Sequence, residues 1–183
     1  PYGGEAFMEQ VRRQVIEPTM EGLRKERIDY RGFLYFGLMK VGDQPYVIEY
    51  NVRMGDPEAQ VVIPRIESDL LEALDAVAHQ RLDDYDLKIS PSAAATVILA
   101  SQGYPGKYPK GKPITLPDDL KNVEVFHAGT QQKEGKLVTS GGRVLALTAI
   151  ARDHNSALST IYQNIESIHF EGHYYRRDIG YDV

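Results

Sequence analysis

The chain has 183 residues, 42% of them hydrophobic, which is enough to bury the core of one large domain or two small ones. Its formal net charge of −5 and its lack of membrane-length apolar runs argue against nucleic-acid and membrane partners. The absence of cysteine excludes disulfides, thiolate catalysis and cysteine zinc sites, and it suits a cytoplasmic protein.

The first predicted element is helical and covers residues 5–27, where Phe7, Val11 and Val15 recur at helical spacing. Pro18 either starts a second helix or kinks a long one, because proline lacks the N–H that an interior helical position needs. No secretory signal is visible at the start of the sequence. The chain begins with Pro1 and not with methionine, so we expect it to be part of a longer protein.

Two strand-like runs follow, residues 31–39 and 46–51, and the turn residues 41–45 between them predict an antiparallel hairpin. Gly32 and Gly37 lie inside the first run, and glycine within a strand often marks a close approach by a backbone or a ligand. The second run alternates, with Tyr46, Ile48 and Tyr50 on one face and Val47, Glu49 and Asn51 on the other.

The predicted face that carries Glu49 and Asn51 suits a divalent cation, with Arg53 next in line if the strand continues. Mg²⁺ prefers oxygen ligands and is usually held by one or two carboxylates together with substrate phosphates. The planar fork of arginine matches phosphate oxygens. By itself, however, a Glu-x-Asn tripeptide favours the simpler interpretation of a solvated strand edge.

Helices are predicted after this strand. Asp56 is expected to cap a short helix over residues 57–63, and Ser68 the next helix. The predicted apolar stripe of that second helix consists of Leu70, Leu71, Leu74, Val77, Ala78 and Leu82. The acidic run at residues 83–86 is interpreted as a solvated linker, in preference to a metal site.

The second half of the chain is predicted to be a smaller α+β unit. We expect strands at residues 93–100 and 123–128, and a hairpin from 136–139 through Gly141 and Gly142 into 143–150. Asn155 is expected to cap a last helix whose core stripe is Leu158, Ile161, Ile165 and Ile168.

Two features of this half leave alternatives open. Residues 103–106, Gly-Tyr-Pro-Gly, either turn the chain or let its backbone approach a ligand. His127 could act as a base, but no serine or carboxylate can be paired with it from the sequence. A histidine that is hydrogen-bonded locally at the end of a strand is the preferred interpretation.

Residues 49–60, Glu-Tyr-Asn-Val-Arg-Met-Gly-Asp-Pro-Glu-Ala-Gln, resemble the strand-and-turn signature of the phosphoribosylamine–glycine ligase family, of the ATP-grasp superfamily. Further segments resemble the same family in the same order along nearly the whole chain. They are Tyr30–Met39, Gly103–Gly106, Phe126–Thr130, Ser140–Leu145 and Arg177–Gly180.

The resemblance implies an α+β fold. Residues 1–85 would be the second half of an ATP-grasp domain, an antiparallel sheet with helices, and residues 86–183 a small α+β C-terminal domain. An N-terminal part of the same protein would be missing, and with it most of the nucleotide-binding elements. The fragment is therefore expected to be inactive alone. Many ATP-grasp enzymes carry an acidic metal ligand on the strand before Glu-x-Asn, and residues 31–39 contain no acid.

The activity implied by the resemblance is ATP-dependent ligation of glycine to 5-phosphoribosylamine, in purine biosynthesis. Glycine would first become glycyl phosphate, and the products would be glycinamide ribonucleotide, ADP and phosphate. ATP would be the co-substrate and Mg²⁺ or Mn²⁺ the cofactor. The alternatives are another ATP-grasp ligase or carboxylase of purine metabolism, and a non-catalytic binding module of the same fold.

Site residues follow from the same resemblance. Glu49 and Asn51 would hold the metal. Arg53 would steady the transferred phosphoryl group or the acyl phosphate, unless it only pairs with Glu49. Asp56 would hold the glycine ammonium or the sugar amine, in addition to or instead of capping a helix, with Glu58 as a second candidate. The loops that would close over phosphoribosylamine or the nucleotide contain Gly103, Tyr104, Pro105, His127–Thr130, Gly141, Gly142 and Arg143.

Overall fold

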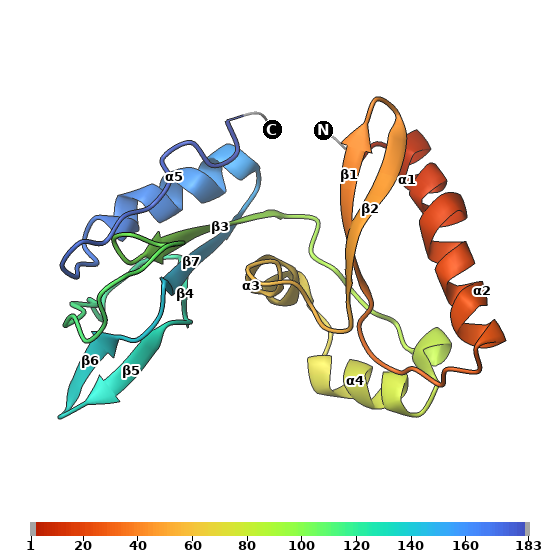
Figure 1. The fold of residues 1–183 in the computed structure, drawn as a ribbon, viewed down its shortest axis with the longest axis horizontal. Helices are drawn as coiled ribbons and strands as arrows, with labels where there is room; N and C mark the ends of the chain where they lie inside the picture. Colours follow the sequence, from red (N-terminus) through yellow and green to blue (C-terminus); the bar gives the residue numbers. More distant parts are fainter. Residues whose placement is uncertain (1–2, 182–183) are drawn as a thin grey trace. The chain divides into compact units, whose positions relative to one another are not determined.

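A computed structural model of the chain describes residues 3–181, which form two compact units (Figure 1). The first unit comprises the residues up to Asp56 together with Ser68–Lys88, and the second comprises Pro57–Glu67 and the residues from Ile89 on. Both units mix helices with antiparallel strands, as the predicted α+β class requires. The domain boundary expected at residue 85 stays a prediction.

A continuous helical segment opens the first unit, as predicted. It consists of α1 (Glu5–Val11), the π-helical η1 (Arg12–Ile16) and α2 (Glu17–Lys25). Pro18 lies in the first turn of α2, where its missing N–H costs little. Val11 and Val15 are buried, and α1 and η1 contact the neighbouring strand β2.

Strands β1 (Tyr35–Val41) and β2 (Gln44–Asn51) form the expected antiparallel hairpin, although β1 begins later than predicted. Glu49 pairs with Gly37 and Val47 with Leu38, which leaves Ile48 as an extra residue at a bulge. The bulge interrupts the alternation. Val47, predicted to share a face with Glu49, instead lines an apolar groove with Tyr50 beside η1 and α2.

Helix α4 (Leu70–Ala78) is capped by Asp69, not by Ser68 as predicted. The Asp69 carboxylate accepts hydrogen bonds from the backbone N–H groups of Leu71 and Glu72, at 2.8 and 3.1 Å. The predicted apolar stripe is also wrong, because Ala73 and Ala76 are the buried residues and Leu71 is 76% exposed. A short 3₁₀ turn, η3 (Leu82–Asp84), follows α4.

Ser68 has a different role, since it ties the two ends of this segment together. Its hydroxyl accepts a hydrogen bond from the Lys88 N–H at 2.6 Å and donates one to the Asp86 carbonyl at 3.1 Å. The acidic run therefore begins in the η3 turn and ends in a loop that Ser68 fixes.

The second unit begins with α3 (Ala59–Val62) and the 3₁₀ turn η2 (Ile63–Arg65), and it continues with a three-stranded antiparallel sheet. The strands β3 (Ala93–Ala100), β7 (Arg143–Ala151) and β4 (Glu124–His127) lie in the order β3-β7-β4. Helix α5 (His154–Ile165) packs on β7 and β3 (Figure 1).

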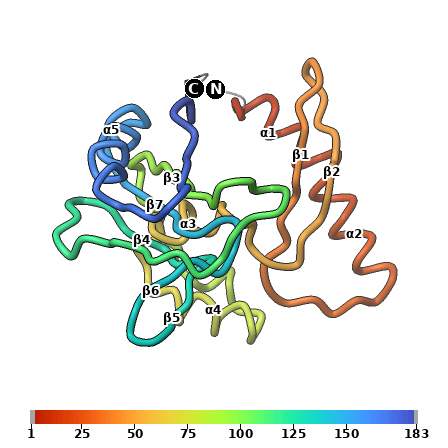
Figure 2. Tube along the Cα trace, turned by 60° about the vertical axis from the view of Figure 1, so that its left-hand side comes forward, coloured from red at the N-terminus to blue at the C-terminus, as the bar shows by residue number. Residues whose placement is uncertain are grey.

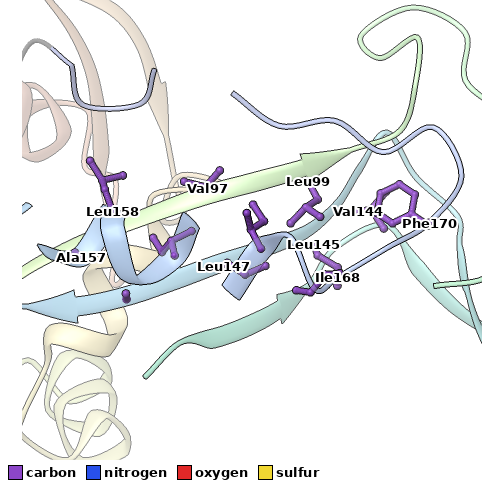
Figure 3. Packing of buried hydrophobic residues seen from close by; sticks show 12 residues of the cluster. Val97, Leu99, Val144, Leu145, Leu147, Ala157, Leu158, Ile168 and Phe170 are labelled. Atoms are coloured by element: carbon purple, nitrogen blue, oxygen red, sulfur yellow. The ribbon is translucent and has the colours of Figure 1, made fainter. Parts of the chain in front are cut away.

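The hydrophobic core of the second unit lies between α5 and this sheet (Figure 3). The predicted stripe of α5 is confirmed, since Leu158, Ile161, Ile165 and Ile168 are all buried. They pack with residues of the sheet and of the segment after α5, among them Val97, Leu99, Val144, Leu145, Leu147 and Phe170. The N-cap of α5 is Asp153, which accepts a hydrogen bond from the Ser156 N–H, and not Asn155 as predicted.

Strands β5 (Thr130–Lys133) and β6 (Lys136–Thr139) form a separate antiparallel hairpin, which the Cα trace in Figure 2 shows as a loop. The predicted hairpin between residues 136–139 and 143–150 is therefore wrong. The actual turn is at Glu134 and Gly135, whose φ angles of 51° and 76° match the two-residue turns typical of hairpins. Within residues 3–181, no helix combines the length and apolar character needed to cross a membrane.

Candidate functional site

The two predicted metal ligands lie side by side near the end of β2, in the first unit. The Asn51 side-chain amide donates a hydrogen bond to Glu49 Oε1 at 3.0 Å. Glu49 is exposed and Asn51 is partly buried. The pair therefore has the shared face and the access to solvent on which the metal prediction depends.

Gly37 lies directly across the hairpin from Glu49. A Cβ atom built on Gly37 would lie 2.8 Å from Glu49 Cγ, closer than side chains tolerate. The glycine inside β1 therefore marks a close approach, but the approaching group is the Glu49 side chain and not the backbone or ligand that was predicted.

This donor set fits one kind of metal site. Among the described residues, no group of three or more His, Cys, Asp or Glu side chains is placed to hold a metal. Glu49 and Asn51 offer one carboxylate and one amide oxygen. Mg²⁺ keeps several waters and shares substrate phosphates, so two protein donors fit an ion held jointly with a nucleotide, not an all-protein cage.

The turn after β2 carries Arg53 and Asp56, both exposed. Arg53 Nη1 donates to the Met54 carbonyl at 2.8 Å, and within residues 3–181 its guanidinium makes no ion pair with Glu49. Helix α3 begins at Ala59, so its N-cap position falls on Glu58 and not on Asp56, where it was predicted. Asp56 and Arg53 belong to the first unit and Glu58 to the second.

In the second unit, two loops that lie far apart in the sequence pack against each other. Ser101 Oγ donates to the Gly141 carbonyl at 2.9 Å, and the Ser101 N–H donates to the Gly142 carbonyl at 2.7 Å. A Cβ atom on Gly142 would lie 2.7 Å from Tyr104 Cε2. The Tyr104 ring therefore lies over a bare glycine, which joins the predicted loops at residues 103–105 and 141–143.

A third predicted loop, residues 127–130, joins the same cluster. A Cβ atom on Gly129 would lie 2.6 Å from Gly141 Cα, and the Ser140 N–H donates to the Gly129 carbonyl at 2.7 Å. His127 Nδ1 lies 3.1 Å from Thr130 Oγ1, which agrees with a local, structural role for this histidine. The structure thus brings three separately predicted loops together.

Sequence reasoning missed two residues that hold this cluster, Ser101 and Tyr174. The Tyr174 hydroxyl donates to the Tyr104 carbonyl at 2.6 Å and so fixes the loop from a segment 70 residues away. No periodicity could have revealed these contacts, because both depend on how the end of β3 meets later parts of the chain.

The C-terminal segment after α5 borders an open pocket of about 410 Å³, lined by Glu166, His173, Tyr174, Tyr175 and Arg177. Arg177 donates to Glu166 at 3.2 Å and lies over the Tyr175 ring, 5.1 Å from its centre. Burial raises the pKa of Tyr175 above its ordinary value. The pocket therefore has polar walls that are already paired with one another.

Two family models match the chain. The ATP-grasp (A) domain of phosphoribosylglycinamide synthetase matches residues 1–59, and the C domain of the same enzyme matches residues 94–182. The chain belongs to the phosphoribosylglycinamide synthetase family. This confirms the resemblance drawn from the motifs.

Relatives of this family cover nearly all of the chain. The phosphoribosylamine–glycine ligase of Chlorobaculum tepidum is 48% identical over 176 residues, which are 94% of this chain and 41% of that protein. The trifunctional purine biosynthetic protein adenosine-3 of Gallus gallus is 49% identical over 93% of this chain and 17% of its own length. The chain thus spans less than half of each of these relatives.

Solved structures agree with the family assignment. The crystal structure of phosphoribosylamine–glycine ligase from Thermotoga maritima superposes with a TM-score of 0.80 at 37% identity, covering 96% of this chain and 44% of that one. Pyruvate carboxylase from Rhizobium etli shares the fold, with a TM-score of 0.63 at 16% identity, over 96% of this chain and 18% of its own. The α+β fold of the second part of an ATP-grasp protein is therefore confirmed.

Proposed function

We propose that this chain contributes a metal-binding strand and substrate-facing loops to the ATP-dependent ligation of glycine to 5-phosphoribosylamine. Family membership and the ligase relatives support the proposal. Because the chain spans only 41–44% of the length of ligase relatives, the activity is proposed for a polypeptide of their full length that contains this chain. We call that polypeptide the complete ligase and expect it in the cytoplasm.

The reaction brings anions together. A glycine carboxylate oxygen attacks the γ-phosphorus of ATP, ADP leaves, and glycyl phosphate forms. The amine of 5-phosphoribosylamine then attacks the carbonyl carbon, phosphate leaves, and the nitrogen loses a proton. The site must offset the negative charge of the carboxylate and of the phosphates, so cationic groups and hydrogen-bond donors should surround the reacting atoms.

The first unit contains residues suited to this requirement. Glu49 and Asn51 would hold Mg²⁺ or Mn²⁺, and the ion would offset charge on the phosphate oxygens of the nucleotide. The exposed guanidinium of Arg53 is suited to contact the transferred phosphoryl group. The Asp56 carboxylate would hold the glycine ammonium or the sugar amine, with Glu58 as a second candidate.

The second unit would contribute the loop cluster described above. Gly103, Tyr104 and Pro105 belong to one loop and Gly141, Gly142 and Arg143 to another, and their packing supports a shared role toward phosphoribosylamine or the nucleotide. The single observation that carries the proposal is the 3.0 Å hydrogen bond between Asn51 and Glu49 in a chain of this family.

Replacing Glu49 with glutamine in the complete ligase tests the proposal. Formation of glycinamide ribonucleotide should fall by about 100-fold or more, because metal-assisted charge stabilisation contributes several kcal/mol. Glu124→Gln, which also changes an exposed glutamate on a strand, should leave the rate unchanged. A near-normal rate for Glu49→Gln at saturating Mg²⁺ would reject Glu49 as a ligand.

The chain of 183 residues by itself should show no turnover with ATP, glycine and 5-phosphoribosylamine. Product formation by this chain alone would mean that the nucleotide site has been placed wrongly. Phosphate release by the complete ligase with a different amine or carboxylate, and none with glycine and phosphoribosylamine, would instead support another ATP-grasp activity.

A further inference from the structure

The side chain of Glu49 occupies the space next to the backbone of Gly37 on the neighbouring strand. Gly37 on β1 pairs with Glu49 on β2, and an added Cβ on Gly37 would meet Glu49 Cγ at 2.8 Å. The nearest backbone atoms of Glu49 would lie at 3.6 Å, which is an ordinary contact. A side chain on Gly37 would therefore displace the Glu49 side chain and leave the backbone of the strand pair in place.

The backbone itself does not require glycine at this position. Gly42 in the adjoining turn has a φ angle of 59°, in the region that favours glycine, whereas Gly37 is not among the described residues with positive φ. Glycine within a strand is unfavourable, because it has no side chain to pack and loses more entropy on folding. The room it leaves for Glu49 is the feature of the structure that explains it.

The position of the Glu49 carboxylate depends on that room. Glu49 extends past Gly37 to accept the hydrogen bond from the Asn51 amide at 3.0 Å. Since Glu49 is exposed, a methyl group on Gly37 would push it toward solvent at little cost to folding, and the contact with Asn51 would be lost. The Glu49 carboxylate would then no longer lie beside the Asn51 side chain.

We propose that Gly37 is a positioning residue for the divalent cation, because its missing side chain sets where the Glu49 carboxylate lies. The proposal rests on the proposed function, in which Glu49 and Asn51 hold Mg²⁺.

The test is the Mg²⁺ dependence of the complete ligase with Gly37→Ala. The Mg²⁺ concentration for half-maximal rate should rise about 10- to 100-fold, as it does when groups that orient a metal ligand are changed. The maximal rate should recover in large part at high Mg²⁺. Gly22→Ala is the matched control, because a Cβ there meets nothing within 4 Å and its helix favours alanine.

A double-mutant cycle separates a positioning role from a general structural one. If Gly37 acts only through Glu49, Gly37→Ala should have no further effect on Mg²⁺ dependence in a Glu49→Gln background. Thermal unfolding of Gly37→Ala should stay close to that of the parent. Loss of the fold, or an equal shift in both backgrounds, would overturn the inference.

The proposed function and the positioning role of Gly37 can fail separately. If Glu49→Gln leaves the Mg²⁺ dependence and the rate unchanged, the proposed function fails, and the role of Gly37 fails with it. If Glu49→Gln lowers turnover as expected while Gly37→Ala behaves as Gly22→Ala does, the metal site stands and the positioning role of Gly37 is wrong.

Discussion

The packing of Tyr104 on Gly142 predicts that Gly142→Ala will disturb the loop cluster of the second unit. The new Cβ would lie 2.7 Å from Tyr104 Cε2 and 2.9 Å from Cγ. Tyr104 Cδ2 would be closer still to the new Cβ. Carbon atoms prefer about 3.5–4.0 Å, so the ring must move by about 1–1.5 Å. Because the Tyr174 hydroxyl holds the Tyr104 carbonyl, the loop resists this shift, and the free energy of unfolding should fall by about 1–3 kcal/mol.

Urea unfolding of the chain measures this cost directly. The comparison needs Gly142→Ala, Tyr104→Ala and the double variant. Removing the ring removes the clash, so the double variant should be about as stable as Tyr104→Ala alone. A loss below about 0.5 kcal/mol for Gly142→Ala, or simple addition in the double variant, would refute the packing argument.

The same substitution also tests the proposed role of the loop in the complete ligase. A displacement of about 1 Å in a group that positions substrate can lower the rate by about 100-fold. We therefore expect Gly142→Ala to reduce kcat/KM by about 10- to 100-fold. An unchanged rate together with the predicted loss of stability would show that the loop packs as described but does not face the substrate.

Three further changes test the described packing. Ile161→Ala removes a fully buried core side chain and should lower the free energy of unfolding in urea by about 2–5 kcal/mol; a loss below about 1 kcal/mol would contradict the core. Asp69→Ala should cost about 1 kcal/mol by the same assay, and no cost would reject the cap. Hydrogen bonds from Arg12 and Arg13 lower the pKa of Glu9 to about 2, so its carboxylate should stabilise the fold above the ordinary pKa of 4.5 and lose this effect as pH falls toward 2. Melting curves of Glu9→Gln and the parent should converge over that range, and a constant difference would contradict the pairing.

The strand pair shows how far alternation in the sequence predicts structure. The prediction that Glu49 and Asn51 share a face was correct, because both lie beyond the bulge. Val47 was misplaced, because the bulge at Ile48 adds a residue to one strand and shifts every earlier side chain to the other face. No local signal in Tyr46–Asn51 announces the bulge, which depends on pairing with β1.

Helix caps were predicted in the right segments but one or two residues away from their true positions. Ser68 and Asp69 both suit a cap, as do Asp153 and Asn155, and the sequence alone does not choose between them. Contacts with other parts of the chain determine which residue is the cap. The Ser68 hydroxyl is hydrogen-bonded to Lys88 and Asp86, so Asp69 caps the helix instead. The N-cap of α3 likewise differs from the prediction, since it was predicted at Asp56 and lies at Glu58.

The loops of the second unit show a different limit. Motif resemblance selected residues 103–106, 126–130 and 140–145 separately, and their meeting depends on backbone contacts between glycines such as Gly129 and Gly141. The hairpin was assigned to Gly141 and Gly142 because paired glycines are typical of turns. In the structure Gly141 packs closely on Gly129 and Gly142 on Tyr104, and the turn residues are Glu134 and Gly135.

The central claim is that Glu49 and Asn51 hold the divalent cation that meets the nucleotide phosphates. A crystal structure of the complete ligase with ADP and Mn²⁺, in which the anomalous signal locates the ion, tests it most directly. The account predicts an ion about 2.1 Å from an oxygen of Glu49 and from the Asn51 amide oxygen, shared with the phosphates. An ion bound to the nucleotide and held by other side chains, with Glu49 and Asn51 turned away from it, would contradict the account.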